Sequence, residues 1–353
     1  MARVPTIQAI TDRAGRQNDL VGPGEILDMK LDTRNKGLSL RAAKLLHLLI
    51  KEAGAKAADD VEHKVAVATL NQTMHLTLND FIATVEELMD VRLRLRVPDG
   101  EGGQPEIWLD RLIQSVKRTE IDNAQAVVRF KLSDSLRKIL ENSVHWAVLS
   151  RKALLAFESR YALRLYELVS LRIGLTRNTE NFTIEDLRER LGVPHGKLMK
   201  WDAFNRKALS PAIAEVNHLS GFVVSCTPYK SGRSVAGVTM QWALAPTTER
   251  VKVQRELEAS RVGRGIRRTR KEEKVVDLLP VLAPEATIFP REGGIAYSSW
   301  ADAARSALPY PRPDIDHVAD RFRDFCGRKG ILLNHPKIAE TFVGFCRNWK
   351  MED

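Results

Sequence analysis

The sequence has few of the residues on which covalent or metal chemistry depends. Its three cysteines, Cys226, Cys326 and Cys346, form no CxxC pair and are odd in number. This argues against a disulfide framework and a structural zinc site, and it favours reduced thiols in a cytoplasm. The eight histidines form no HxH pair, and neither an HExxH motif nor a P-loop occurs. We therefore expect no catalytic residue, no metal and no cofactor.

Long apolar runs are also absent. No stretch approaches the ~20 apolar residues of a membrane span, and the N-terminus lacks the apolar core of a signal peptide. We therefore expect a cytoplasmic protein with no membrane-spanning part.

Acidic residues are outnumbered, with 45 Asp and Glu against 55 Lys and Arg, which gives a formal net charge of +10. This balance favours a polyanionic partner, either nucleic acid or an acidic membrane surface, although it also serves solubility. With 44% hydrophobic residues, the 353-residue chain has enough apolar side chains for a sizeable core. Its length predicts two or three domains.

The first part of the chain has the element order of a winged helix. Residues 1–25 are polar and broken by prolines and glycines, which predicts a flexible tail. Two amphipathic helices follow, with Ser39 and Thr77 as N-caps. The stretch VRLRLRV at 91–97 alternates strictly and predicts a strand, DGEGG predicts a hairpin tip, and EIWLDRLIQSVKR predicts one return strand. Helix, helix and hairpin together predict a winged helix over residues 26–150.

This first winged helix has two candidate uses. The alternating strand places Arg92, Arg94 and Arg96 on one face, which suits contact with DNA phosphates. An exposed strand edge also suits pairing between two copies of the chain. The second helix begins with Thr77 and Asp80 rather than with basic residues. We therefore expect this domain to supply dimerisation or DNA backbone contacts rather than base reading.

A second copy of the same element order covers residues 151–247. A long helix begins near Leu154, Thr183 caps a short helix, and a third helix follows from about residue 201. Two strands then flank the predicted hairpin tip YKSGRS. No literal sequence repeat accompanies this order, so the predicted duplication is one of architecture alone.

The third helix of this second copy is basic in its first half and apolar in its second, with Pro211 between the halves. A proline there removes a backbone hydrogen bond and bends the axis. In a helix-turn-helix, the front of such a helix enters the major groove while its rear packs on the core. A surface helix with solvated charges is the alternative interpretation, but basic residues in the preceding turn and in the hairpin favour DNA contact. The candidate DNA-contacting residues are Lys197, Lys200, Asn205, Arg206, Lys207, Ser210, Lys230, Ser231 and Arg233.

The C-terminal part has two kinds of composition. Residues 250–274 contain ten basic and four acidic residues, which predicts either a mobile basic arm or a solvated linker. The prolines that follow predict an extended chain. We therefore assign residues 248–313 as a linker. Two amphipathic helices around Gly330 predict a small helical hairpin over 314–353. The predicted fold class is α+β: two tandem winged helices, a basic linker and a small C-terminal helical segment.

Four segments, in this order and spacing, are similar to the plasmid replication initiator (Rep) family: YALRLYELV (161–169), FTIEDLRERLGV (182–193), FNRKALSPAIAEVN (204–217) and GRSVAGVTMQWAL (232–244). Proteins of this family carry tandem winged helices and bind directly repeated origin sequences called iterons. The resemblance implies that the helix at 204–217 reads the major groove, with Arg206 and Lys207 as base or phosphate contacts. It also implies a non-enzymatic initiator in the bacterial cytoplasm that starts DNA unwinding and recruits the host initiator and the replicative helicase. A monomer–dimer equilibrium, with a dimer that represses its own promoter, is implied in the same way.

Two features depart from the family pattern. Leu198 stands where an aromatic residue is expected, and a long segment follows the second hairpin. Two other functions fit the residues: a winged-helix transcriptional regulator that binds a palindrome as a symmetric dimer, and a protein-interaction scaffold. Direct repeats beside the coding region would favour the initiator.

Overall fold

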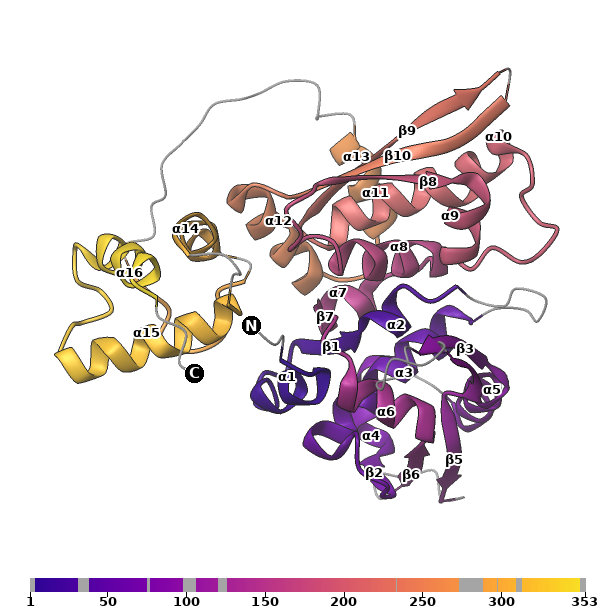
Figure 1. Ribbon diagram of the computed structural model, residues 1–353, viewed down its shortest axis with the longest axis horizontal. Helices are drawn as coiled ribbons and strands as arrows, with labels where there is room; N and C mark the ends of the chain where they lie inside the picture. The colour runs from indigo at the N-terminus through magenta and orange to yellow at the C-terminus, as the bar shows by residue number, and fades with distance from the viewer. Residues whose placement is uncertain are drawn as a thin grey trace. The chain divides into compact units, whose positions relative to one another are not determined.

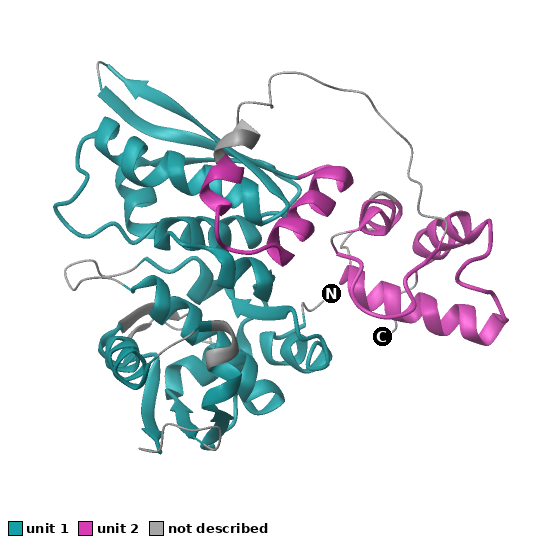
Figure 2. Ribbon diagram, turned by 180° about the vertical axis from the view of Figure 1, so that it is seen from behind, with its two compact units in different colours: residues 1–244 teal, residues 245–353 magenta. Residues whose placement is uncertain are grey.

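The computed structural model of the protein describes residues 4–30, 38–74, 77–97, 106–119, 126–232, 234–272, 288–296, 298–308 and 313–349. The chain forms two compact units, Met1–Leu244 and Ala245–Asp353, which Figure 2 shows in two colours. Short helices and small antiparallel sheets make up the first unit, and helices make up the second. This confirms the predicted α+β class with two tandem winged helices.

The first winged helix packs three helices against one face of a three-stranded antiparallel sheet. Its elements are α3 (Leu40–Ala53), the 3₁₀ turn Gly54–Lys56, β2 (His63–Ala66), α4 (Val67–Met74), α5 (Leu78–Asp90), β5 (Ile113–Arg118) and β6 (Val127–Leu132), with α6 (Asp134–Asn142) after the last strand. The strand order is β2-β6-β5. Alternate residues of β2 and β6, among them Val65, Val128 and Phe130, are buried toward the helices. Successive side chains of a strand point to opposite faces, so the residues between the buried ones lie on the face of the sheet that the helices do not cover.

The second winged helix repeats this topology. Its elements are α8 (Arg160–Ser170), β8 (Thr179–Thr183), α9 (Ile184–Arg190), α10 (Trp201–Phe204), a π-helical turn (Asn205–Leu209), α11 (Ser210–Leu219), β9 (Phe222–Ser231) and β10 (Ser234–Leu244). The strand order β8-β10-β9 again places the last strand between the first and the second. Figure 1 shows β9 and β10 as a long hairpin that extends beyond the helices. The architectural duplication expected from the element order is therefore present.

Three predicted helix starts are confirmed at the level of single atoms. Ser39 Oγ accepts a hydrogen bond from the Ala42 amide at 3.2 Å, and Thr77 Oγ1 accepts one from the Asp80 amide at 3.1 Å. Thr183 accepts from the third amide of α9 in the same way. A side-chain cap satisfies one of the amides that a helix start leaves without a partner, which explains why these positions were predictable.

The predicted return strand at 106–118 is wrong as a single element. β3 (Arg92–Val97) pairs with β4 (Glu106–Arg111), but the next residue, Leu112, is fully buried and its carbonyl accepts a hydrogen bond from the Ser133 amide at 3.2 Å. This contact turns the chain into a different sheet, where it continues as β5. The hairpin that corresponds to β9–β10 by topology is therefore β5–β6, and the predicted tip DGEGG lies outside the described residues.

The predicted flexible tail is corrected over its described part. Residues 4–27 form α1 (Thr6–Asp12), β1 (Asp19–Pro23) and α2 (Gly24–Leu27), and β1 pairs with β7 (Trp146–Ser150). Thr6 is fully buried, and both its amide and its hydroxyl donate to the Ser143 carbonyl at 2.8 Å. A Cβ on Gly24 would lie 2.4 Å from the His145 ring, so this glycine permits close packing rather than disorder.

The predicted long helix from Leu154 is two helices. α7 (Arg151–Ala156) ends, and Ser159 Oγ then caps α8 by accepting from the Tyr161 amide at 3.2 Å. Glu215 of α11 accepts from the Glu158 amide at 2.5 Å, so the break is also held from outside. A serine that offers its hydroxyl to the backbone favours a cap over a helix interior, which explains the interruption.

A buried polar network joins the two winged helices. The Arg164 guanidinium donates to the carbonyl oxygens of Ile26 at 3.3 Å and Met29 at 2.6 Å, and to the Glu167 carboxylate at 2.6 Å. His47 Nε2 of the first winged helix lies 2.7 Å from the other oxygen of Glu167. The side chains of His47 and Glu167 are each 2% exposed. Because these groups are buried, loss of any one of them would leave a polar partner inside the protein without its hydrogen bond.

A second, more exposed set of ion pairs borders this network. Asp28 pairs with Arg172 at 3.3 Å and also with Arg190 of α9. Lys30 lies 2.6 Å from Asp186. The segment before residue 31 thus lies against the second winged helix, which makes unit 1 a single body rather than two domains on a flexible linker.

Unit 2 corrects the predicted linker. Its elements are α12 (Thr247–Glu258), α13 (Arg264–Glu272), α14 (Ser299–Ala307), α15 (Ile315–Lys329) and α16 (Ile338–Arg347). The basic stretch forms α12 and α13 rather than an extended chain, and Glu256 of α12 links the two helices by accepting from Arg264 at 3.2 Å and from Arg267 at 2.7 Å. Residues 273–287 lie outside the described residues.

The two predicted C-terminal helices are confirmed as α15 and α16, and Gly330 ends α15 with φ of 65°. They pack around Phe289, whose ring lies 4.9 Å from those of Trp300, Phe322 and Phe342. Phe289 and α14 come from the segment predicted as linker. The C-terminal unit therefore completes its own hydrophobic core with that segment.

Candidate nucleic-acid interface

The candidate reader helix runs through residues 201–219 as α10, the π-helical turn and α11. In the π-helical turn the Ser210 amide donates to the Asn205 carbonyl, five residues back. Pro211 is the second residue of α11. The backbone hydrogen bonds are therefore shifted from the α-helical to the π-helical pattern directly before Pro211, which has no amide hydrogen to donate. The irregularity expected at Pro211 takes the form of a π-helical turn directly before it.

The two faces of the reader helix differ as the sequence predicted. Its rear is buried against α8 and β9 through Phe204, Ala208, Ala212, Val216 and Leu219. Its front exposes Arg206, Lys207 and Ser210, with Asn205 half-buried beside them. Because the rear anchors the helix, the front presents its side chains from a fixed backbone.

Two polar residues of this front are linked to each other. Ser210 Oγ donates to Asn205 Oδ1 at 2.8 Å. This hydrogen bond spans the π-helical turn and fixes the amide plane of Asn205. Within the described residues the amide nitrogen donates to no group, so both of its hydrogens can serve an acceptor outside the protein, as an adenine N7 or a phosphate would supply.

The turn before the reader helix is held from the inside. Arg188 of α9 is buried and its guanidinium donates to the Lys197 carbonyl. Leu198, half-buried, has φ of 50°, and it alone among the described non-glycine residues has a positive φ. Such backbone costs on the order of 1–3 kcal/mol and persists only where packing fixes it. The exposed side chains of Lys197 and Lys200 are thus presented by a fixed turn.

The wing is the β9–β10 hairpin. Lys230, Ser231 and Gly232 form its described tip, with all three exposed and Gly232 at φ of 64°. Arg233 lies outside the described residues. The tip is therefore a narrow basic turn that requires glycine at one position.

The base of the wing is fixed to the neighbouring strand. The pairing of β10 with β9 is interrupted by a bulge before Gly237. Tyr229 Oη donates to the Phe182 carbonyl of β8 at 3.5 Å, and a Cβ on Gly237 would lie 2.3 Å from both of these oxygen atoms. The hairpin therefore leaves the sheet in a defined direction.

The basic surface consists of the exposed cations of the turn, the reader helix and the wing: Lys197, Lys200, Arg206, Lys207 and Lys230. Within the described residues none of them forms an ion pair, whereas Arg172 and Arg190 of the same domain each pair with carboxylates. Of the nearby acids, Glu215 is buried at the rear of the helix. Uncompensated cations on three adjacent elements give a surface suited to phosphate and to guanine edges.

The corresponding helix of the first winged helix has a different front. Asp80 of α5 accepts from Thr77 Oγ1 at 2.9 Å and pairs with Arg41 at 2.5 Å. The Thr77 hydrogen bond, followed by the Arg41 interaction, holds the pKa of Asp80 below its usual value. An ionised carboxylate at this position repels phosphate, so α5 lacks the basic front of the reader helix.

The three strand arginines, Arg92, Arg94 and Arg96, lie in β3 opposite Arg111, Leu109 and Ile107 of β4. β3 and β4 form a ribbon of their own rather than part of the winged-helix sheet. The described structure thus gives their backbone register, and their DNA contact stays a prediction.

Sequence reasoning missed Arg188. It was not among the candidate residues, yet it is buried and donates to the backbone of the turn. No local motif signals this contact, because the partner is a main-chain carbonyl nine residues away.

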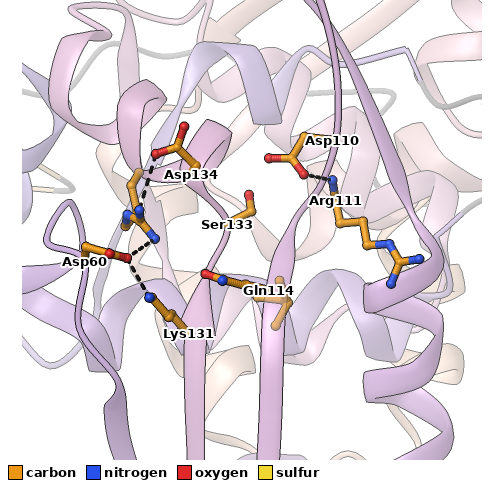
Figure 3. Close-up of a pocket in the computed structure, with 9 residues that line it drawn as sticks. Asp60, Asp110, Arg111, Gln114, Lys131, Ser133 and Asp134 are labelled. Carbon is orange, nitrogen blue, oxygen red and sulfur yellow. Dashed lines mark hydrogen bonds and ion pairs between the residues drawn. The ribbon is translucent and has the colours of Figure 1, made fainter.

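A polar hollow in the first winged helix is lined by charged side chains (Figure 3). Asp60 pairs with Lys131 at 2.8 Å and with Arg137 at 2.7 Å, while Asp110 accepts from the Arg111 amide at 2.7 Å. Asp60 is thus neutralised by two cations and Asp110 is bonded to the backbone, so neither carboxylate indicates a ligand in the hollow. Within the described residues no group of three metal-ligating side chains occurs, and no helix is long and apolar enough to cross a membrane.

Comparison with known proteins gives two family matches. Residues 28–170 match the family described as Initiator Replication protein, WH1, and residues 183–242 match the family described as Initiator Rep protein, WH2. Similar solved structures include the Pi initiator protein in complex with iteron DNA, at 17% identity and a TM-score of 0.47, covering 65% of this chain and 98% of that one. Another is RctB domains 2–3, at 12% identity and a TM-score of 0.32, covering 60% of this chain and 83% of that one. No curated protein matches the sequence.

Proposed function

Because the two matched regions together cover more than half of the chain, the protein belongs to the family of replication initiator (Rep) proteins, and we propose that it initiates plasmid replication by binding direct repeats, or iterons, in double-stranded origin DNA. The observation that carries the proposal is the basic surface, whose five exposed cations have no acidic partner within the described residues. The reader helix enters the major groove with its front, and the wing contacts the flanking phosphates.

Each element has a role in this binding. Arg206 donates to a guanine edge, while Asn205 donates from the amide that Ser210 orients. Lys230 at the wing tip and Lys197 in the turn contact phosphates, which fixes the register without reading sequence. Family membership supports the later steps: start of unwinding, recruitment of the host initiator and the replicative helicase, and repression of its own promoter by a dimer.

The binding mode is tested by footprinting and methylation interference on the DNA beside the coding region. Two winged helices in one rigid unit should contact positions about one helical turn apart, ~10–10.5 base pairs. We expect guanine contacts clustered in the half of each repeat under Arg206, because the front of α5 holds an Asp80–Arg41 ion pair and lacks the free cations of the reader helix. Equal base contacts in two inverted halves would instead identify a symmetric regulator, and no protection would favour a scaffold.

The affinity for the repeat should fall steeply with salt. Neutralisation of about five phosphates releases condensed counterions, so raising the salt from 50 to 200 mM should weaken binding by about 10³-fold. Fluorescence anisotropy with a labelled repeat measures this dependence. A flat response over this range would contradict DNA binding through the basic surface.

A further inference from the structure

The exposed face of the first winged-helix sheet carries a row of cations. Arg129 of the central strand β6 lies directly opposite Lys64 of β2 on one side and Lys117 of β5 on the other. Residues directly opposite one another in an antiparallel pair share a face of the sheet. Lys64, Arg129 and Lys117, the cationic row, therefore lie side by side across the whole width of this sheet.

The row faces solvent. All three residues are exposed, while their chain neighbours Val65, Val128 and Phe130 are buried on the opposite face. The helices of the domain pack on that buried face, so none of them covers the row.

Within the part of the chain that the structure describes, one carboxylate forms an ion pair with the row. Lys117 lies 2.8 Å from Glu62, and this hydrogen bond, with the charge of Arg129, holds the pKa of Glu62 below its usual value. Within the described residues Lys64 and Arg129 make no hydrogen bond or ion pair through their side chains. The row thus retains a positive charge that the protein itself does not neutralise.

The second winged helix provides an internal comparison. At the equivalent strands β8, β10 and β9, the exposed face carries the row Asn181, Thr239 and Thr227 in the same cross-strand arrangement. This row is neutral, and Thr239 Oγ1 donates to Asn181 Oδ1 at 2.7 Å. The fold therefore does not require charge at this place.

The cationic row also opposes stability. Like charges directly opposite one another on a sheet repel, and here two such pairs share Arg129. The two domains thus place their cations differently: on the reader helix, turn and wing in the second, and on the sheet face in the first, where the helix front holds Asp80.

We propose that the cationic row binds the phosphate backbone of the same duplex that the reader helix holds, on the flank next to the first winged helix. The proposal rests on the proposed function, which supplies the duplex. Figure 1 places β2, β5 and β6 at the end of unit 1 opposite the β9–β10 wing, so the row reaches DNA that the wing does not. A linear row of cations matches a linear array of phosphates, and electrostatic complementarity to that array identifies the occupant.

The test compares the full-length protein with the Lys64→Gln/Arg129→Gln variant on three duplexes. One duplex carries a single footprinted repeat with long flanks, one is trimmed at the flank next to the first winged helix, and one is trimmed at the opposite flank. On the long duplex we expect the variant to bind more weakly, by on the order of tenfold or more, with a salt slope smaller by about 2. The same loss is expected when the opposite flank is trimmed. On the duplex trimmed next to the first winged helix, the two proteins should bind equally.

A matched control removes the same net charge elsewhere. In Lys138→Gln/Arg177→Gln, both residues are ion-paired on the surface, to Asp134 and Glu180, and binding should stay within twofold of the unaltered protein. The cationic-row variant should melt at an equal or higher temperature, since repulsion is relieved, which separates lost contact from lost folding.

Three outcomes would overturn the assignment or its premise. If the unaltered protein binds the repeat and the row variant matches it on every duplex, the row is not a DNA surface. If the difference appears only when an unlinked second duplex is added, the row holds another DNA molecule rather than the flank. If the unaltered protein does not bind any repeat, the proposed function itself fails.

Discussion

Replacing Arg206 by alanine should weaken binding to the repeat by ~1–3 kcal/mol, about 5- to 150-fold, and should relax the preference at one or two base pairs. The guanidinium is exposed on the front of the reader helix, and the described residues hold it in no ion pair. Its loss therefore removes a contact with DNA and breaks no ion pair among the described residues. Competition binding against repeats with single base changes measures both effects.

The wing supplies the matched control. Lys230→Ala removes one exposed cation at the hairpin tip, where phosphate contact is expected. It should weaken binding to all sequences alike and reduce the salt slope by about 1. If Arg206→Ala instead changes neither affinity nor base preference, the front of the helix does not face the groove.

Replacing Arg164 by alanine should destabilise unit 1 by ~3–5 kcal/mol, because it leaves the buried Glu167 carboxylate without its main positive partner. It also removes the donors to the carbonyl oxygens of Ile26 and Met29, which weakens the contact between the winged helices. Urea unfolding monitored by circular dichroism measures the change.

Arg160→Ala on the same helix is the control for this substitution. Arg160 lies over the Tyr161 ring at 4.9 Å and donates to its hydroxyl at 3.1 Å, in a partly exposed position. Its removal should cost no more than ~1 kcal/mol. Equal losses in the two variants would mean that the Arg164 network does not join the domains.

The same network makes the stability of unit 1 depend on pH. Burial alone would raise the pKa of Glu167, but the charge of Arg164 and the His47 hydrogen bond outweigh it and hold the pKa below its usual value. A carboxylate with a depressed pKa contributes stability above its unfolded pKa of about 4.3, and this contribution is lost as the pH falls through the folded value. In Arg164→Ala, the loss of stability on acidification should therefore be smaller.

Local chemistry explains what could be predicted from the sequence. Ser39, Thr77 and Thr183 cap helices through hydroxyls that bond amides three residues on, so each start is visible in a window of four residues. The basic front and apolar rear of the reader helix follow from periodicity in the same way. The DNA roles of Arg206 and its neighbours remain predictions.

The failures involve partners that are distant in sequence. The glycines and prolines near residue 23 resemble a loose tail, yet β1 pairs with β7, more than a hundred residues later. Leu112 interrupts an apparently continuous strand because the Ser133 amide bonds its carbonyl. Phe289, in a proline-rich stretch, is the centre of an aromatic core whose other rings come from three helices. The composition of a segment predicts its local structure, whereas these contacts depend on the position of residues that are distant in sequence.

The π-helical turn gives the reader helix an angular offset. Each residue advances an α-helix by about 100°, so the wider turn at Asn205–Leu209 rotates what precedes it relative to the anchored half that follows. Pro211 fixes this phase, because in a plain α-helix its ring would crowd the turn before it. Deleting one residue from the turn would swing Phe204 and the residues before it around the axis relative to Ala212, Val216 and Leu219. The target of such a protein can therefore change through a shift of phase, with no change in the side chains that meet the DNA.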